Sequence, residues 1–160
     1  SKTKLTRHQC RELIFKLLFA KEFDKEATPN EYYETYIEIT EEPTAEYVKN
    51  VFLGVCEAMD EIDAEIENCS IKWKMSRMST ATRTILRLAV YEMTKIDVPA
   101  KVVLNEALEI IKMYDDESAP AFVIALKSVL FPTFGRPTIP SFIGDQILLL
   151  MVISFGCTPG

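Results

Sequence analysis

The sequence has little glycine, one histidine and no long apolar run, and each shortage excludes a class of function. Gly54 is the only glycine before residue 135, so the chain has neither a GxxxxGK[ST] phosphate loop nor a GxGxxG dinucleotide turn. His8 lies two residues from Cys10 on one predicted helix, so their side chains point apart and do not form a catalytic pair. No run of 18 apolar residues predicts a transmembrane helix.

The cysteines and acidic clusters do not predict a metal site. The four cysteines form no CxxC pair, and "DEIDAEIE" and "DDE" lack the spacing and the glycine of a calcium loop. The opening "SKTKLTRHQC" has cationic residues but no apolar segment after them, so it does not resemble a signal peptide. We therefore expect a cytoplasmic protein with reduced thiols, no membrane association, no cofactor or metal, and no catalytic residues.

Hydrophobic spacing predicts an all-α fold, a compact bundle of six or seven helices over residues 1–130. The chain is 48% hydrophobic and 26% charged, as globular domains are, and no window alternates strictly enough for a strand. Gly54, within a predicted helix, either permits close helix packing or lets a ligand approach. Capping residues and prolines predict where the helices begin and end. In the first half of the chain we expect a helix capped by Thr6 with Gln9 that ends near residue 22, a helix between Pro29 and Pro43, and a long helix from Pro43 to about residue 68. In the second half we expect a helix capped by Ser79, a helix starting at Pro99, and a last helix after "DDESAP".

Residues 131–160 form a tail of different composition. They hold four of the five glycines, four of the eight prolines and only two charged residues, and they end in the apolar run "ILLLMVISF". This run is too short to span a bilayer. Either it packs on the domain or on a partner, including a second copy in a homo-oligomer, or it is unstructured.

Charge is segregated along the chain, although the net charge is −6. Residues 22–70 carry fifteen acidic residues against Lys25 and Lys49, whereas residues 1–21 carry six cations against Glu12, and residues 71–91 carry five cations and no acid. If the helices bearing the two basic stretches pack side by side, the stretches merge into one positive face. Basic residues interleaved with aromatic rings are typical of single-stranded nucleic-acid binding.

The segment "TRTILRLAVYEMTK", residues 82–95, carries a four-residue series of basic and aromatic side chains beside an ordinary core face. We name Arg83, Arg87, Tyr91 and Lys95 the basic series. Like charges at this spacing repel on a helix, which raises the question of what the basic series faces. Either it faces nucleic acid, or it forms a solvated or salt-bridged face in which Arg87 pairs with the long acidic helix and Tyr91 is half-buried.

The segment "RLAVYEMTKIDVPAKVVLNEALEIIKMY" resembles the NusB family of transcription antitermination factors, whose pattern is LR-x-A-x-YE, a V-P loop and a helix containing NEA-x-E. "RHQCRELIFKLLF" is similar to the family's arginine-rich opening, "FLGV" around Gly54 to its L-x-G-V, and Trp73 and Arg77 to its W-x-x-x-R connector. The resemblance covers residues 5 to about 123. After Phe122 the chain reads "FVIALKSVL" without the family's asparagine, and residues from 131 onward have no family counterpart.

The resemblance implies a NusB-like RNA-binding protein without catalysis. It would bind boxA RNA of ribosomal RNA leader transcripts together with NusE, a small-subunit ribosomal protein, and join the RNA polymerase antitermination complex. Two rivals remain: a protein-interaction module whose acidic helices dock a basic partner, and the NusB-like domain of an RNA cytosine methyltransferase. The RNA-binding residues expected from the family and the basic stretches are Lys4, Arg7, His8, Arg11, Arg83 and Phe122.

Overall fold

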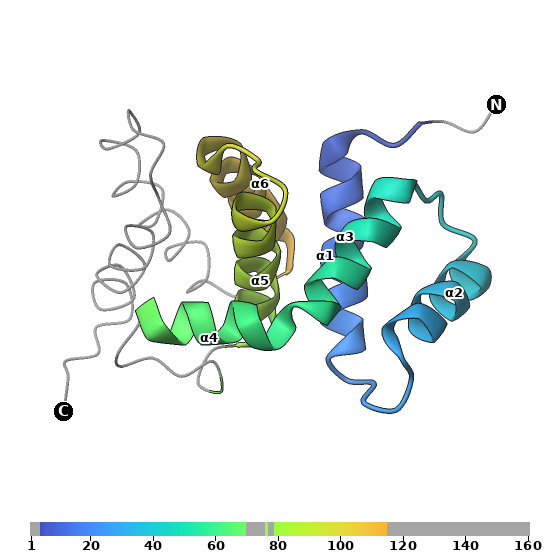
Figure 1. The fold of residues 1–160 in the computed structure, drawn as a ribbon. Helices are drawn as coiled ribbons and strands as arrows, with labels where there is room; N and C mark the ends of the chain where they lie inside the picture. Colours follow the sequence, from blue (N-terminus) through green and yellow to red (C-terminus); the bar gives the residue numbers. More distant parts are fainter. Residues whose placement is uncertain (1–3, 70–75, 77–78, 115–160) are drawn as a thin grey trace. The chain divides into compact units, whose positions relative to one another are not determined.

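The computed structural model describes residues 4–69, 76 and 79–114, and the described residues contain six α-helices and no strand. They confirm the all-α prediction (Figure 1). The chain divides into two compact units, Ser1–Met59 and Asp60–Gly160. The helix expected after "DDESAP" and the tail at 131–160 lie outside the described residues, so the boundary expected at residue 130 stays a prediction.

The first unit contains α1 (Arg7–Lys21), α2 (Pro29–Thr40) and α3 (Glu46–Glu57). Helix α1 packs against α3, and α2 contacts both. Apolar side chains at helical spacing form the core between them, because burial of such a face stabilises a helix more than its propensity does. The fully buried large side chains of this unit are Ile14, Phe15, Leu17 and Phe52.

Two capping boxes set the starts of α1 and α2. The Thr6 N–H donates to Gln9 Oε1 at 2.9 Å and the Gln9 N–H donates to Thr6 Oγ1 at 3.2 Å, as the sequence predicts. Thr28 and Glu31 repeat the arrangement at the start of α2, with Pro29 in the first turn. Each box satisfies amide groups that a helix start otherwise leaves unpaired.

The predicted long helix from Pro43 to about residue 68 is wrong in two respects. Pro43 precedes the helix: α3 begins at Glu46, with Ala45 in an extended conformation at its N-cap. The helix is also interrupted at Ala58, whose backbone angles (φ −91°, ψ 9°) leave the helical region, so that α3 and α4 (Met59–Cys69) are separate helices. No glycine or proline marks this interruption, which is why the sequence pattern did not reveal it.

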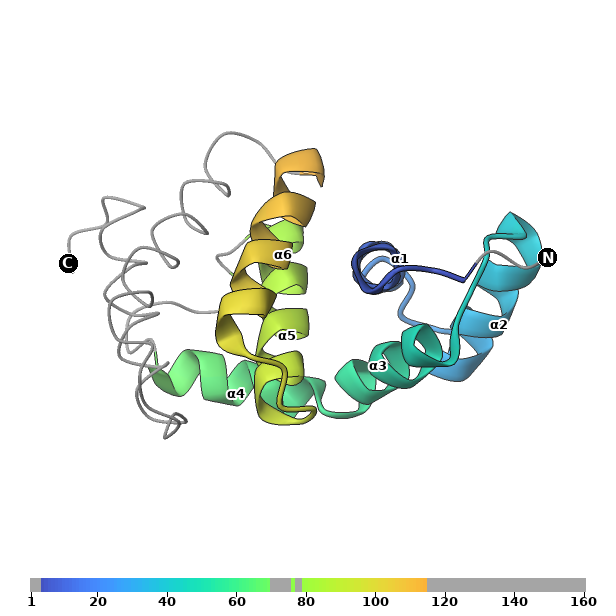
Figure 2. The ribbon, with the colours of Figure 1, turned by 90° about the horizontal axis from the view of Figure 1, so that it is seen from above.

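The second unit contains nearly all of α4, together with α5 (Thr80–Thr94) and α6 (Ala100–Tyr114). Helices α5 and α6 lie side by side in both views (Figures 1 and 2). As predicted, Ser79 caps α5: its Oγ accepts from the Thr82 N–H at 3.2 Å. Helix α6 follows Pro99 directly, and a left-handed residue, Asp97 (φ 53°), completes the preceding turn. Fully buried side chains of this unit include Ile62, Ile66, Leu104, Ile110 and Ile111.

Candidate nucleic-acid interface

The start of α1 displays a cationic side chain on an aromatic ring. Arg7 occupies the first turn of α1 and is exposed, and its guanidinium carbon lies 3.7 Å from the centroid of the Tyr47 ring on α3. A cation within about 6 Å of a ring centroid is attracted by the ring's negative face. Tyr47 is half-buried, so the ring is a firm support that restricts the arginine side chain.

The first turn of α1 has no acidic residue, which is unusual because the positive end of a helix favours carboxylates. Arg7 and the half-buried His8 occupy this turn instead, and the exposed Lys4 lies just before it. The helix dipole and the Lys4 and Arg7 side chains therefore all make the start of α1 positive. Such a combination attracts anions such as phosphate groups.

Arg11, one turn further along α1, has a different environment. Only 5% of its surface is exposed, so among the two arginines of α1 it is Arg7 that displays its guanidinium. Both arginines act on the buried Cys10 thiol: burial raises its pKa, and the two positive charges partly oppose that rise. A contact between Arg11 and RNA stays a prediction.

The middle of the basic series is neutralised by α4. Arg87 Nε donates to Asp63 Oδ1 and Arg87 Nη2 donates to Asp63 Oδ2, both at 2.8 Å, in a bidentate pair. The side chains are 9% and 24% exposed, respectively. Lys95 pairs with Glu61 at 2.6 Å. The salt-bridged alternative is therefore confirmed for Arg87 and Lys95, and Tyr91 is half-buried as that alternative expected.

Arg83, at the start of the basic series, is half-buried. Its Nη2 donates to Thr80 Oγ1 at 3.3 Å, one turn earlier on α5. The first turn of α5 thus holds part of the side chain against the helix. Its role in RNA binding stays a prediction.

Several expected residues lie outside the described residues, among them Phe122 and the cations at 72, 74 and 77, so the merging of the two basic stretches into one face also stays a prediction. The sequence pattern does not indicate a role for Tyr47. It lies in an acidic stretch, far from Arg7 along the chain, and only the packing of α1 on α3 brings the two together. No local pattern signals such a pair.

Neither a metal-binding cluster nor a membrane-spanning helix is found in the part of the chain that the structure describes. Among residues 4–69, 76 and 79–114, no group of three or more His, Cys, Asp or Glu side chains is placed to hold an ion. None of the helices in this part of the chain is long and apolar enough to cross a membrane.

The fold and these surfaces define an all-helical protein that displays a cationic, aromatic-supported site at the start of its first helix. The NusB family model matches residues 8–126, and the chain belongs to the NusB family. The chain is similar to a transcription antitermination protein NusB of Clostridium acetobutylicum, with 40% identity over 122 residues that cover 74% of this chain and 90% of that protein. The NusB of Lachnoclostridium phytofermentans is 38% identical, covering 74% and 93% of the two chains.

Solved structures show the same fold. A crystal structure of T. maritima NusB superimposes with a TM-score of 0.66 at 28% identity, covering 92% of this chain and 93% of that one. A structure of antitermination factors NusB and NusE in complex with dsRNA also has a TM-score of 0.66, at 24% identity, and covers 81% of this chain and 100% of the other. These matches confirm the NusB-like fold that the sequence motifs predicted.

Proposed function

We propose that this protein is an RNA-binding antitermination factor that binds boxA RNA of ribosomal RNA leader transcripts together with NusE and acts within the RNA polymerase antitermination complex. The supporting observation is the exposed Arg7 stacked on Tyr47 at a helix start that lacks carboxylates. Membership of the NusB family supports the biological role. A NusB of the same fold has been crystallised with NusE and dsRNA.

The proposed RNA contacts divide into an α1 group and a group elsewhere. Lys4, Arg7 and His8 lie before or within the first turn of α1, where charge and helix dipole act together on phosphates. Arg11, Arg83 and Phe122 complete the proposed set on the family resemblance. The first group gives the sharper test, because its two cations, Lys4 and Arg7, are exposed.

The test is a titration of fluorescently labelled boxA RNA with the protein, with and without NusE, monitored by anisotropy. We expect binding that is tighter for boxA than for a scrambled RNA of equal length and that tightens further with NusE. The logarithm of the affinity should fall linearly with the logarithm of the salt concentration, by roughly 0.7 per phosphate contact. Equal binding of both RNAs, or none, would overturn the proposal.

Two rivals predict different results in the same titration. A protein-interaction module would bind a basic protein and no RNA. A methyltransferase domain is disfavoured because the relatives that the chain matches over about 90% of their length are named antitermination proteins.

A further inference from the structure

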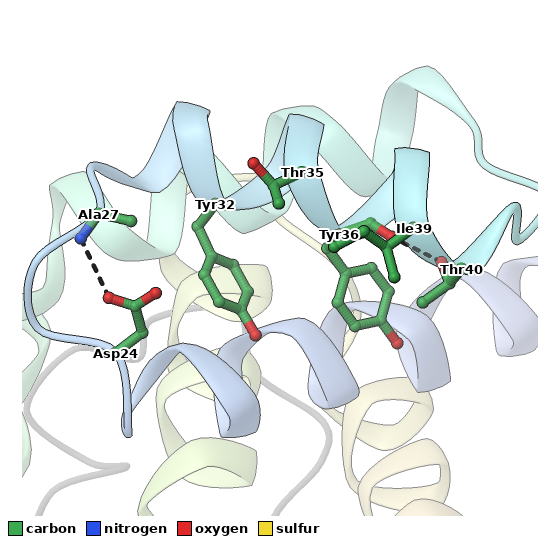
Figure 3. A pocket seen from close by; sticks show the side chains of 7 residues that line it. All are labelled: Asp24, Ala27, Tyr32, Thr35, Tyr36, Ile39 and Thr40. Carbon is green, nitrogen blue, oxygen red and sulfur yellow. Dashed lines mark hydrogen bonds between the residues drawn. The ribbon is translucent and has the colours of Figure 1, made fainter.

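A groove on the first unit lies along one face of α2, apart from the residues proposed to bind RNA. It has a volume of about 250 Å³ and is bounded by α2 and by the loop that joins α1 to α2. The Tyr32 and Tyr36 rings lie side by side, 6.3 Å between centroids, with Asp24 at one end of the groove and Ile39 at the other (Figure 3).

The lining of this groove is apolar and open to solvent. Ile39 is 76% exposed although it lies on a well-formed helix, and the two tyrosine side chains are only half-buried. Single exposed apolar residues are common on protein surfaces, but an isoleucine beside two aromatic rings in a concave site is typical of a docking surface. Aromatic side chains of this kind supply much of the binding energy at protein interfaces.

Carboxylates flank both ends of the groove. Asp24 Oδ1 accepts from the Ala27 and Glu26 N–H groups, both at 3.0 Å, and these bonds, with a smaller effect of the Lys21 charge, lower the pKa of its carboxyl. At the other end, burial raises the pKa of the Tyr36 hydroxyl, and the charge of Glu42 and its hydrogen bond with Tyr36 raise this pKa further. Residues 21–42 carry eight acidic residues against two cations, Lys25 and Lys21, and the Lys21 ammonium lies 5.9 Å from the centroid of the Tyr32 ring, so the net charge around the groove is strongly negative.

We propose that this groove docks a short basic segment of a partner protein, with an apolar side chain on Ile39 and Tyr36 and a lysine or arginine at Asp24. Charge complementarity selects this occupant. Phosphates of a nucleic acid would be repelled by the surrounding carboxylates, and the same face of a second copy is equally acidic. The groove thus provides an interaction surface additional to the RNA site and independent of it.

The test uses two synthetic 12-residue peptides with leucines at the same helical spacing, one with lysine and one with glutamate at the remaining positions. Each is titrated into the ¹⁵N-labelled full chain. We expect the lysine peptide to shift the amide signals of residues 24–40 and the glutamate peptide to shift none. Ile39→Ser should weaken lysine-peptide binding about tenfold, which corresponds to about 1.4 kcal/mol.

Matched variants separate groove contacts from general stickiness. Phe23→Ser removes a side chain that is 71% exposed and does not line the groove, so binding should stay unchanged. Asp24→Asn keeps an oxygen acceptor for the loop amides and removes the charge, so we expect weaker binding. Glu57→Gln, which neutralises an exposed carboxylate at the end of α3, should have no effect.

Four results would overturn the proposal. One is that the two peptides bind equally well, or that neither peptide binds. Another is an equal effect of Ile39→Ser and Phe23→Ser. A third is a shift of the same amides by boxA RNA, which would assign the groove to RNA. The last is a concentration-dependent shift without peptide that Ile39→Ser abolishes, which would make a second copy the occupant.

Discussion

Helices α1 and α5 each carry two arginines four residues apart, yet the first arginine of α1 and the second arginine of α5 have opposite environments. Arg7 is exposed and rests on an aromatic ring, whereas Arg87 is buried and held by both oxygens of Asp63. The difference comes from the neighbouring helix: α3 presents Tyr47 to α1, and α4 presents carboxylates to α5. Arginine spacing on one helix therefore does not distinguish a ligand site from a structural ion pair; the chemistry of the adjacent helix does.

The largest effect is expected for Arg87→Ala. It leaves Asp63 largely buried without its bidentate partner, and we expect a loss of about 3 kcal/mol in the free energy of unfolding, measured by urea denaturation. Asp63→Ala should cost a similar amount, and the double variant should cost less than the sum. If Arg87→Ala unfolds like the parent but loses RNA binding, Arg87 is an RNA-binding residue like Arg7 and not a structural ion-pair residue.

Arg7→Ala should affect RNA binding and leave folding almost unchanged. The side chain is exposed, so its removal should lower the salt slope of boxA binding by roughly 0.7 while the free energy of unfolding changes by about 1 kcal/mol or less. Lys25→Ala provides the control, because Lys25 is an exposed cation of the same unit within the acidic stretch. An unchanged slope for Arg7→Ala would remove the start of α1 from the RNA site.

Tyr47 should influence RNA binding through Arg7. In Tyr47→Leu the Arg7 side chain loses the ring that restricts it, so RNA binding must order that side chain at a cost of about 0.5–1.5 kcal/mol, and boxA affinity should fall by a factor of about two to ten. Tyr47→Phe keeps the ring and should retain the affinity. In the Arg7→Ala background the same substitution should have no further effect. An undiminished loss in that background would show that Tyr47 acts independently of Arg7.

Lys95→Met should have the smallest effect and sharpens the contrast within α5. Its pair with Glu61 is exposed, so we expect a loss of about 0.2–1 kcal/mol in the free energy of unfolding, which high salt should reduce. A loss as large as that of Arg87→Ala would mean that burial does not determine how much the Arg87–Asp63 and Lys95–Glu61 pairs contribute to stability.

Features set by neighbouring residues were predictable from the sequence. The Thr6–Gln9 box and the Ser79 cap join residues three apart, and the structure has both. The interruption at Ala58 was not predictable, because a break without glycine or proline depends on tertiary packing. The sequence also raised an acidic partner for Arg87 as one alternative, but identifying Asp63 required the helix packing. Identifying Tyr47 as the aromatic partner of Arg7 also required the packing of α1 on α3.

The capping box of α2 couples folding of the first unit to proton release. Bonds from the Thr28 hydroxyl and amide lower the pKa of Glu31, and two loop amides lower that of Asp24, so the native state holds fewer protons on these carboxyls than the unfolded chain does in mild acid. Their contribution to stability is complete above the ordinary pKa values of 4.5 and 3.8 and disappears as the pH falls through the lower native values. Unfolding of this unit in acid therefore consumes protons, and Thr28→Ala reduces that uptake.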